Sequence, residues 1–145
     1  MRFVACMKAF LALVFAITFA SAGFAGPAAA ATTTKNVSPD EAEALIKNSP
    51  KLVILDVRTP DEFAAGHIPG AKNVDFFGDD FEKQIAALDP AKPLLVHCAA
   101  GNRSAQAVAQ IEALKKFAAI YHLKAGFRGW TAAKKPVEGK GAGGK

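Results

Sequence analysis

Cysteine is scarce in this sequence, with two residues in a chain of 145. Cys6 lies in an N-terminal segment that we expect to be removed, which leaves Cys98 as the single cysteine of the mature protein. A lone cysteine forms no internal disulfide and has no second thiol to resolve a mixed disulfide, so thiol–disulfide exchange is disfavoured. In an exported protein such a thiol is either buried and inert or a reactive group, and this choice decides the function.

A basic stripe is also missing, although the formal net charge is +5. The basic residues are scattered, several fall in the last dozen positions, and no aromatic stacking motif accompanies them. A nucleic-acid partner is therefore not expected. Glycine (12) and proline (8) occur at ordinary counts, which argues against a collagen-like or broadly disordered chain. The length and the 51% share of hydrophobic residues suit one globular domain.

The N-terminal segment has the three parts of a secretory signal peptide. Basic residues open it, residues 9–20 are almost continuously apolar, and two Ala-x-Ala cleavage patterns follow at 20–22 and 28–30. The apolar run is shorter than the roughly 20 residues of a membrane-spanning helix, so an uncleaved anchor is the less favoured alternative. We therefore expect residues 1–31 to be a cleaved leader and the mature protein to be exported to the periplasm, without stable membrane insertion after cleavage.

After the leader, helix signals alternate with short apolar runs typical of buried strands. Capping-box sequences begin at Ser38 and at Thr59, each followed by proline and, three positions on, by glutamate. Strands are expected at 51–57, 71–74, 93–97 and 120–123, and helices at 39–48, 60–65, 79–88, 103–117 and around Trp130. This alternation predicts an α/β domain over residues 32–138, with a central parallel sheet of about five strands and helices on both faces. Residues 139–145, with the Gly- and Lys-rich stretch from Lys134, are expected to be a disordered tail.

Two of the expected strands end in residues with charged or reactive side chains. Asp56-Val57-Arg58 ends one strand, and His97-Cys98 ends another. In parallel sheets, sites lie at the carboxyl ends of the strands. Both segments are therefore expected at one edge of the sheet.

The segment after Cys98 favours a reactive thiol. A helix start presents unpaired backbone N–H groups and a dipole that favours negative charge. Gly101 and its small neighbours allow these groups to converge on one point, and Arg103 adds positive charge. Such a setting lowers the pKa of a thiol and favours its thiolate, whereas the alternative is an inert buried cysteine. The expected cradle for the sulfur comprises Ala99, Ala100, Gly101, Asn102, Arg103 and Ser104.

Three ordered segments resemble the rhodanese family. The loop at Cys98 looks like the family's active-site loop. Residues 55–71 are similar to its Asp-Val-Arg and Gly-His-Ile-Pro-Gly-Ala signature, and residues 125–130 resemble its Gly-Gly-x-x-x-Trp ending. The resemblance covers residues 37–138; Ala125, where the family often has glycine, departs from it in the last turn and not in the chemistry.

The resemblance implies a rhodanese-like fold and a sulfurtransferase that carries sulfur as a persulfide on Cys98. The implied partners are a small anionic sulfur donor, such as thiosulfate, and a nucleophilic acceptor, such as cyanide or a thiol. This chemistry is covalent catalysis that needs no metal or organic cofactor. The small loop side chains suggest an open, weakly selective pocket, while the oligomeric state is not indicated.

Two other functions stay open at this point. A persulfide carrier would hold sulfur for a partner without efficient turnover. A phosphatase or arsenate relative would bind an oxyanion at the same cradle. Cys98 and Arg103 enclose four residues, whereas the family's phosphatase-like members carry one more, so the resemblance implies sulfur transfer.

Asp56 and Arg58 are expected to support the site and the sheet edge, which is the usual role of these positions in the family. Two roles remain open for Arg103. It either orients the loop and meets the anionic donor, or it forms a structural ion pair.

The remaining polar residues near these motifs are expected to be structural. Asn102 and Ser104 are expected to cap the helix that follows Cys98. His97 and His67 are not expected to act as bases, because a thiol with a lowered pKa needs none. Trp130 is expected in the core. The core face of the helix expected at 103–117 is predicted to comprise Val108, Ile111, Ala113 and Leu114.

Overall fold

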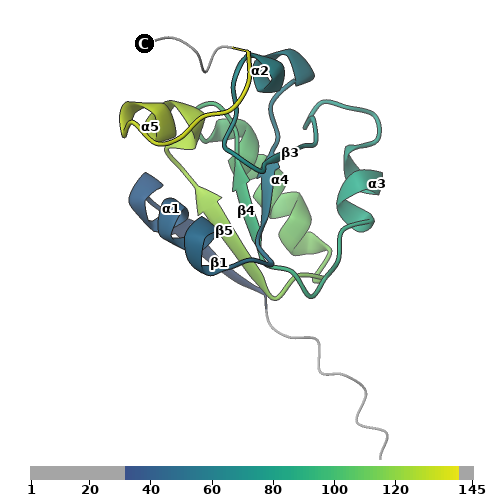
Figure 1. Cartoon of the computed structure of the whole chain (residues 1–145). Coiled ribbons are helices and arrows are strands. Elements are labelled where there is room, and N and C mark those ends of the chain that lie inside the picture. Colours follow the sequence, from purple (N-terminus) through teal and green to yellow (C-terminus); the bar gives the residue numbers. More distant parts are fainter. Residues whose placement is uncertain (1–31, 141–145) are drawn as a thin grey trace, which may run out of the picture.

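The computed structural model describes residues 32–140 and shows a five-stranded sheet between helices (Figure 1). The expected leader, residues 1–31, lies outside the described residues. The strands are β1 (Thr33–Val37), β2 (Val53–Asp56), β3 (Lys72–Asn73), β4 (Leu94–His97) and β5 (Ala119–Leu123). The helices are α1 (Pro39–Asn48), α2 (Pro60–Ala65), α3 (Phe81–Ala86), α4 (Asn102–Ala113) and α5 (Gly126–Ala132).

The strands are parallel and lie in the order β1-β5-β4-β2-β3. This arrangement confirms the expected α/β fold with a parallel sheet. Its register pairs Asp56 at the end of β2 with His97 at the end of β4. The two strand ends that the sequence singled out therefore lie side by side.

The sheet separates two hydrophobic clusters, because successive side chains of a strand point to opposite faces. Leu55 and Val96 belong to a cluster that includes residues of α3 and α4. Ile54 and Leu95, their neighbours in β2 and β4, belong to a second cluster with residues of α1 and α5. Helices thus cover both faces, as expected for buried parallel strands.

Both expected capping boxes are confirmed. The Ser38 hydroxyl accepts the backbone N–H of Glu41, whose carboxylate accepts the backbone N–H of Ser38 in return. Thr59 and Glu62 make the same exchange at the start of α2. These reciprocal bonds satisfy N–H groups that lack partners within the helix, so both helices begin where the sequence predicts.

The edge strand β1 was not predicted. Its sequence, Thr-Thr-Lys-Asn-Val, lacks an apolar run, and only Val37 is buried. The strand lies at the end of the sheet, where it pairs with β5 alone. An exposed edge strand needs no hydrophobic pattern, so a prediction based on such patterns does not find it.

The helix after Cys98 ends earlier than predicted, at Ala113 instead of 117. Ala113 and Leu114 were expected in the core, but both are exposed. Ala107 is buried instead, together with Val108 and Ile111. The expected core face was therefore wrong in its last turn.

The segment 134–140, expected to be disordered, lies against the domain. Trp130 Nε1 donates a hydrogen bond of 2.7 Å to the carbonyl of Pro136. The prediction of disorder was therefore wrong up to residue 140, and residues 141–145 lie outside the described part of the chain. Further backbone bonds join His67 and Glu138 in both directions (2.7 and 2.8 Å) and Lys140 to Ala64 (3.1 Å).

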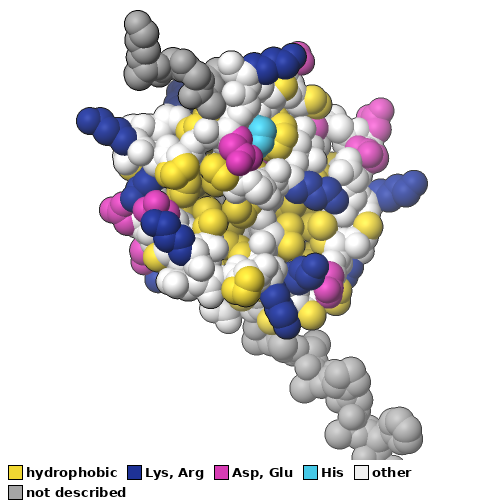
Figure 2. All heavy atoms as spheres, viewed as in Figure 1, with side chains coloured by type: hydrophobic (Ala, Val, Ile, Leu, Met, Phe, Trp, Pro, Cys, Tyr) yellow, Lys and Arg dark blue, Asp and Glu magenta, His cyan; other side chains and the backbone are white. Residues whose placement is uncertain are grey.

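The face shown in Figure 2 carries lysine and arginine side chains interspersed with aspartate and glutamate, around a hydrophobic centre. No single basic patch gathers on this face. Within residues 32–140, every helix is too short or too polar to cross a lipid bilayer.

Candidate active site

The candidate site begins where β4 ends and α4 starts. Cys98 follows the buried strand directly, and Gly101 is the N-cap residue of α4 with φ 98°. A Cβ atom at Gly101 would lie 2.2 Å from the carbonyl oxygen of Lys124. Both the left-handed backbone and this close approach require glycine, so the residue that curls the loop is fixed by sterics.

Two hydrogen-bond donors, from Gly101 and Ser104, point to the sulfur of Cys98. The Gly101 N–H lies 3.2 Å from Cys98 Sγ, and the Ser104 hydroxyl lies 3.4 Å from it. Burial is the largest single effect on this thiol and by itself raises the pKa. The hydrogen bond from Ser104 Oγ and those from the backbone N–H groups of Ser104, Ala100 and Gly101 together outweigh burial, so the pKa of Cys98 lies below its ordinary value.

The sulfur is closely covered. Cys98 is 1% exposed, while Ala100 on the outer side of the loop is exposed. The expectation of an open pocket over the thiol is therefore wrong for this conformation.

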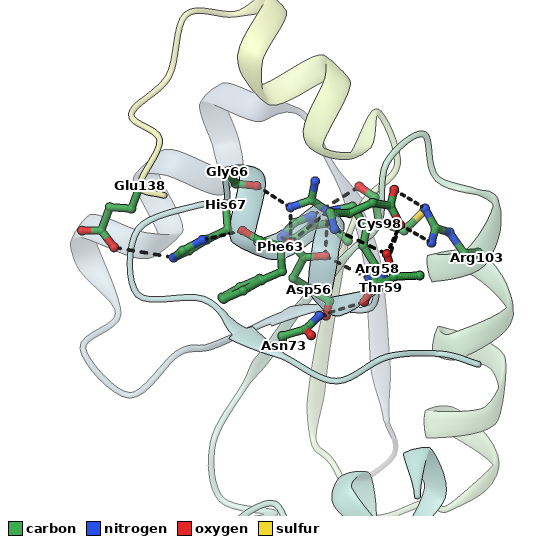
Figure 3. Close-up of polar contacts among 12 residues, drawn as sticks. Asp56, Arg58, Thr59, Phe63, Gly66, His67, Asn73, Cys98, Arg103 and Glu138 are labelled. Carbon is green, nitrogen blue, oxygen red and sulfur yellow. Dashed lines mark hydrogen bonds and ion pairs between the residues drawn. The ribbon is translucent and has the colours of Figure 1, made fainter. Parts of the chain in front are cut away.

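Asp56 and Arg58 form a buried ion pair beside this loop (Figure 3). Arg58 Nε donates to both carboxylate oxygens at 2.9 and 3.0 Å, and Nη2 donates to Oδ2 at 2.5 Å and to the carbonyl of Gly66 at 2.7 Å. The guanidinium also lies 4.2 Å from the ring centroid of Phe127. The pair thus ties the end of β2 to the end of α2 and to α5, as a supporting role requires.

Arg103 forms a two-point ion pair with Glu62. Nη1 and Nη2 donate to the two carboxylate oxygens at 2.7 and 2.8 Å. These hydrogen bonds from Arg103 are the main cause that lowers the pKa of Glu62 to about 2. Of the two roles left open for Arg103, the geometry favours the ion pair, which holds α4 against α2.

Comparison with known proteins identifies the family. The sequence model of the rhodanese-like domain family matches residues 38–133, which is most of the chain. The chain belongs to the rhodanese-like domain family. It is 37% identical over 98 residues to thiosulfate sulfurtransferase GlpE of Ectopseudomonas mendocina (strain ymp), covering 68% of this chain and 85% of that protein. Over 101 residues it is 37% identical to thiosulfate sulfurtransferase GlpE of Pseudomonas aeruginosa (strain LESB58), covering 69% of this chain and 86% of the relative.

Solved structures show the same architecture. A rhodanese-related protein of Thermoplasma volcanium superposes with a TM-score of 0.62 at 27% identity, covering 72% of this chain and 97% of that one. A rhodanese-like domain protein of Staphylococcus aureus gives a TM-score of 0.59 at 29% identity, with coverages of 66% and 90%. These likenesses support the rhodanese fold that the sheet order shows.

The two histidines that were considered as bases, His67 and His97, contact backbone carbonyls. His67 Nδ1 lies 2.9 Å from the carbonyl of Phe63. The His97 ring is fully buried, with Nδ1 3.3 Å from the carbonyl of Cys98 and Nε2 3.8 Å from Asp56 Oδ2. Burial is the main cause that lowers the pKa of His97, which keeps the ring neutral. These contacts agree with structural roles.

The expected helix caps were wrong. Asn102 is the first residue of α4 and is exposed, and neither its side chain nor that of Ser104 caps the helix. Ser104 is fully buried, and its hydroxyl contacts Cys98 Sγ, the Gly101 carbonyl at 3.1 Å and His122 Nε2 at 2.9 Å.

His122 was missed by the sequence reasoning. It lies in β5, within an expected strand, and is 6% exposed. A polar residue in a short buried strand was the only signal that could have pointed to it.

Proposed function

We propose that this rhodanese-family chain is an enzyme that transfers sulfane sulfur through a persulfide on Cys98. The donor is thiosulfate or a similar anion, and the acceptor is cyanide or a thiol. The observation that carries the proposal is the set of donors on Cys98 Sγ, above all the Gly101 N–H at 3.2 Å, together with the lowered pKa of the thiol. The likeness to curated thiosulfate sulfurtransferases supports the same reaction class.

The reaction proceeds in two displacements at sulfur. The Cys98 thiolate attacks the outer sulfur of thiosulfate, a new S–S bond forms, and the bonding electrons of the old S–S bond leave with sulfite. The persulfide keeps one negative charge on its terminal sulfur. Cyanide then attacks that sulfur, thiocyanate leaves, and the electron pair returns to Cys98 as the thiolate.

The loop stabilises the charge that both steps leave on sulfur. Backbone N–H groups of Gly101, Ala100 and Ser104 lower the pKa of the Cys98 thiol, and we expect the same groups to stabilise the terminal sulfur of the persulfide. Because Cys98 is 1% exposed, the atoms that cover it must move before the donor can reach it. Turnover is therefore expected to depend on loop movement as well as on thiol reactivity.

The short loop disfavours phosphate or arsenate as the group that reacts in the cradle. The Cys98–Arg103 segment encloses four residues, its amides lie directly on the sulfur, and Arg103 is held by Glu62. A phosphate would need several free donors around a wider cradle. A carrier without turnover has the same geometry and is separated from the enzyme by kinetics. We further propose that the protein works after export, which rests on the leader sequence alone.

The deciding experiment is a thiosulfate-to-cyanide assay on the full-length chain carrying Cys6→Ser, compared with the same chain carrying Cys98→Ser in addition. Thiocyanate should form with the first protein and not with the second, and intact mass after thiosulfate should rise by about 32 Da only in the first. Persulfide without catalytic turnover would favour the carrier. Thiocyanate production that survives Cys98→Ser would remove Cys98 from the mechanism, and hydrolysis of p-nitrophenyl phosphate would favour the phosphatase.

A further inference from the structure

A line of polar side chains connects the sulfur to the edge of the sheet. Ser104 Oγ lies 3.4 Å from Cys98 Sγ and 2.9 Å from His122 Nε2. On the other side of the ring, His122 Nδ1 lies 3.0 Å from Asn36 Oδ1. The parallel register pairs Asn36 directly with His122, so the sheet itself holds this last contact in place.

The Ser104 hydroxyl has one proton and three polar neighbours. The carbonyl of Gly101, at 3.1 Å, only accepts hydrogen bonds, and so does the thiolate of Cys98. His122 is the one of the three that can also donate. When the sulfur carries negative charge, the Ser104 hydroxyl can donate its proton to the sulfur. Its oxygen then accepts a hydrogen bond from His122 only if Nε2 of the ring carries a proton.

The two neutral forms of His122 therefore have opposite effects on the sulfur. With the proton on Nδ1, the ring donates to Asn36 and its bare Nε2 takes the hydroxyl proton of Ser104 away from Cys98. With the proton on Nε2, the ring donates to Ser104 and the hydroxyl proton is free for sulfur. Asn36 serves both forms, because half a turn of its carboxamide exchanges the acceptor Oδ1 for the donor Nδ2.

We propose that His122 is a positioning residue for sulfur transfer, whose Nε2–H directs the Ser104 hydroxyl to the sulfur at position 98 and so holds negative charge there. Its part in turnover rests on the proposed function, whereas its effect on the thiol does not. During the cycle the charge alternates between the Cys98 sulfur and the terminal persulfide sulfur, and the hydroxyl can follow it by a small rotation.

The surroundings of His122 keep the ring neutral. Burial is the main cause that lowers its pKa, and the charge of Lys124 on the same strand end acts in the same direction, against a backbone contact with Gly101. Asn36 from β1 is uncharged, and the titratable group facing the ring from the β4 side is Cys98, through Ser104. A neutral ring must choose between its two tautomers, and this choice is the control that we propose.

Two substitutions separate the two ring nitrogens. In His122→Gln the terminal amide reaches the position of Nε2 and can donate to Ser104, while in His122→Asn the shorter amide reaches only the position of Nδ1. Both variants are made in the full-length chain with Cys6→Ser, and the rate of alkylation by iodoacetamide is followed against pH. We expect H122N to raise the thiol pKa and to slow alkylation at neutral pH by about fivefold, the value of one hydrogen bond, and H122Q to restore most of this loss.

A double-variant cycle tests whether His122 acts through Ser104. Ser104→Ala should raise the thiol pKa at least as much as H122N. Adding H122N to Ser104→Ala should then change alkylation by less than about twofold, because the hydroxyl that His122 directs is already absent. An equal loss from H122N in both backgrounds, or an H122N profile with an unchanged thiol pKa, would overturn the proposal.

A measurement without substitution covers the case in which H122N does not fold. The ¹⁵N shifts of the His122 ring are followed through the titration of Cys98, and the Nε2–H form should dominate once the thiolate has formed. A ring that keeps its proton on Nδ1 in the thiolate form would contradict the proposal. Alkylation and the ring shifts can be measured without a sulfur donor, so they test the role of His122 even if no thiocyanate is formed. A failure to form thiocyanate would count against the proposed function and not against the role of His122.

Discussion

Glu62 and Arg103, 41 positions apart, join the helix that follows the Asp56–Arg58 pair to the helix that follows Cys98. The Glu62 carboxylate accepts the two guanidinium donors at 2.7 and 2.8 Å while it also closes the capping box of α2. One carboxylate therefore fixes both the start of α2 and the position of α4. Its ionisation links the loop at Cys98 to the rest of the fold.

This ion pair predicts an acid sensitivity with a definite sign. The folded-state pKa of Glu62 is about 2, below its ordinary value of 4.5, so its stabilisation is complete above about pH 4.5 and is lost as the pH falls toward 2. Since the side chain is 36% exposed, we expect Glu62→Gln to lower the free energy of unfolding at pH 7 by only about 1 kcal/mol.

Urea titrations of the parent and E62Q between pH 7 and pH 2.5 check this prediction. The difference between the two proteins should shrink as the pH falls. A difference that stayed constant over this range would show that the carboxylate charge does not contribute. Lys47→Gln, which breaks an i,i+4 pair between exposed Lys47 and half-buried Glu43, is the control and should change stability by less than about 0.5 kcal/mol at either pH.

Gly101→Ala is expected to cost more than Gly70→Ala, although both glycines have positive φ, 98° and 75°. A left-handed alanine costs about 1–2 kcal/mol at either position. At Gly101 the new Cβ would also lie 2.2 Å from the Lys124 carbonyl oxygen, whereas at Gly70 nothing lies within 4 Å. We expect G101A to lose about 2 kcal/mol more stability than G70A and to lose thiol reactivity. Equal costs in chemical denaturation would mean that the loop can move away from Lys124 without loss.

Asp56→Asn should be among the most destabilising polar substitutions in the domain. Asp56 is fully buried, and its loss leaves the buried Arg58 guanidinium without its charge partner. Breaking such a pair costs about 3–5 kcal/mol. Replacing both residues, with Asp56→Leu and Arg58→Met, should recover part of this loss. If D56N and the double variant were equally unstable, the unpaired charge would not be the cause.

The sequence predicted the elements whose signals are local. Ser38 and Thr59 mark helix starts through short-range hydrogen bonds, and the apolar runs of β2 and β4 reflect burial on both sides, so these elements were placed correctly. The strand β1 was missed because an edge strand with exposed side chains carries no such pattern.

The contacts inside the site were less predictable, because several of them join residues that are far apart in the sequence. Cys98, Gly101 and Arg103 lie in one continuous segment, so their proximity follows from the chain itself. His122 reaches the sulfur only through Ser104, and Glu62 reaches Arg103 from another helix. Contacts of this kind depend on strand order and register, which a hydrophobic pattern does not specify.

Export remains a prediction that the leader sequence alone supports. Expression of the full-length chain in a Gram-negative host should give a shortened protein in the periplasmic fraction, with its N-terminus after one of the Ala-x-Ala patterns, at 20–22 or 28–30. Fractionation with N-terminal sequencing measures both. Full-length protein retained in the membrane fraction would instead indicate an uncleaved anchor.

The lowered pKa of Cys98 also predicts how stability changes with pH. Burial opposes ionisation of this thiol, but the hydrogen-bond donors of Ser104, Ala100 and Gly101 outweigh it. The folded protein therefore binds the proton of the Cys98 thiol more weakly than the unfolded chain does. The resulting stabilisation is fully present above the unfolded pKa, about 8.5, and is lost as the pH falls through the folded pKa. The free energy of unfolding of the Cys6→Ser protein, relative to the same protein with Cys98→Ala, should therefore increase from pH 6 to pH 9. A decrease over this interval would mean that burial dominates and that the thiol is held neutral, which would leave the sulfur without the charge that the proposed transfer needs.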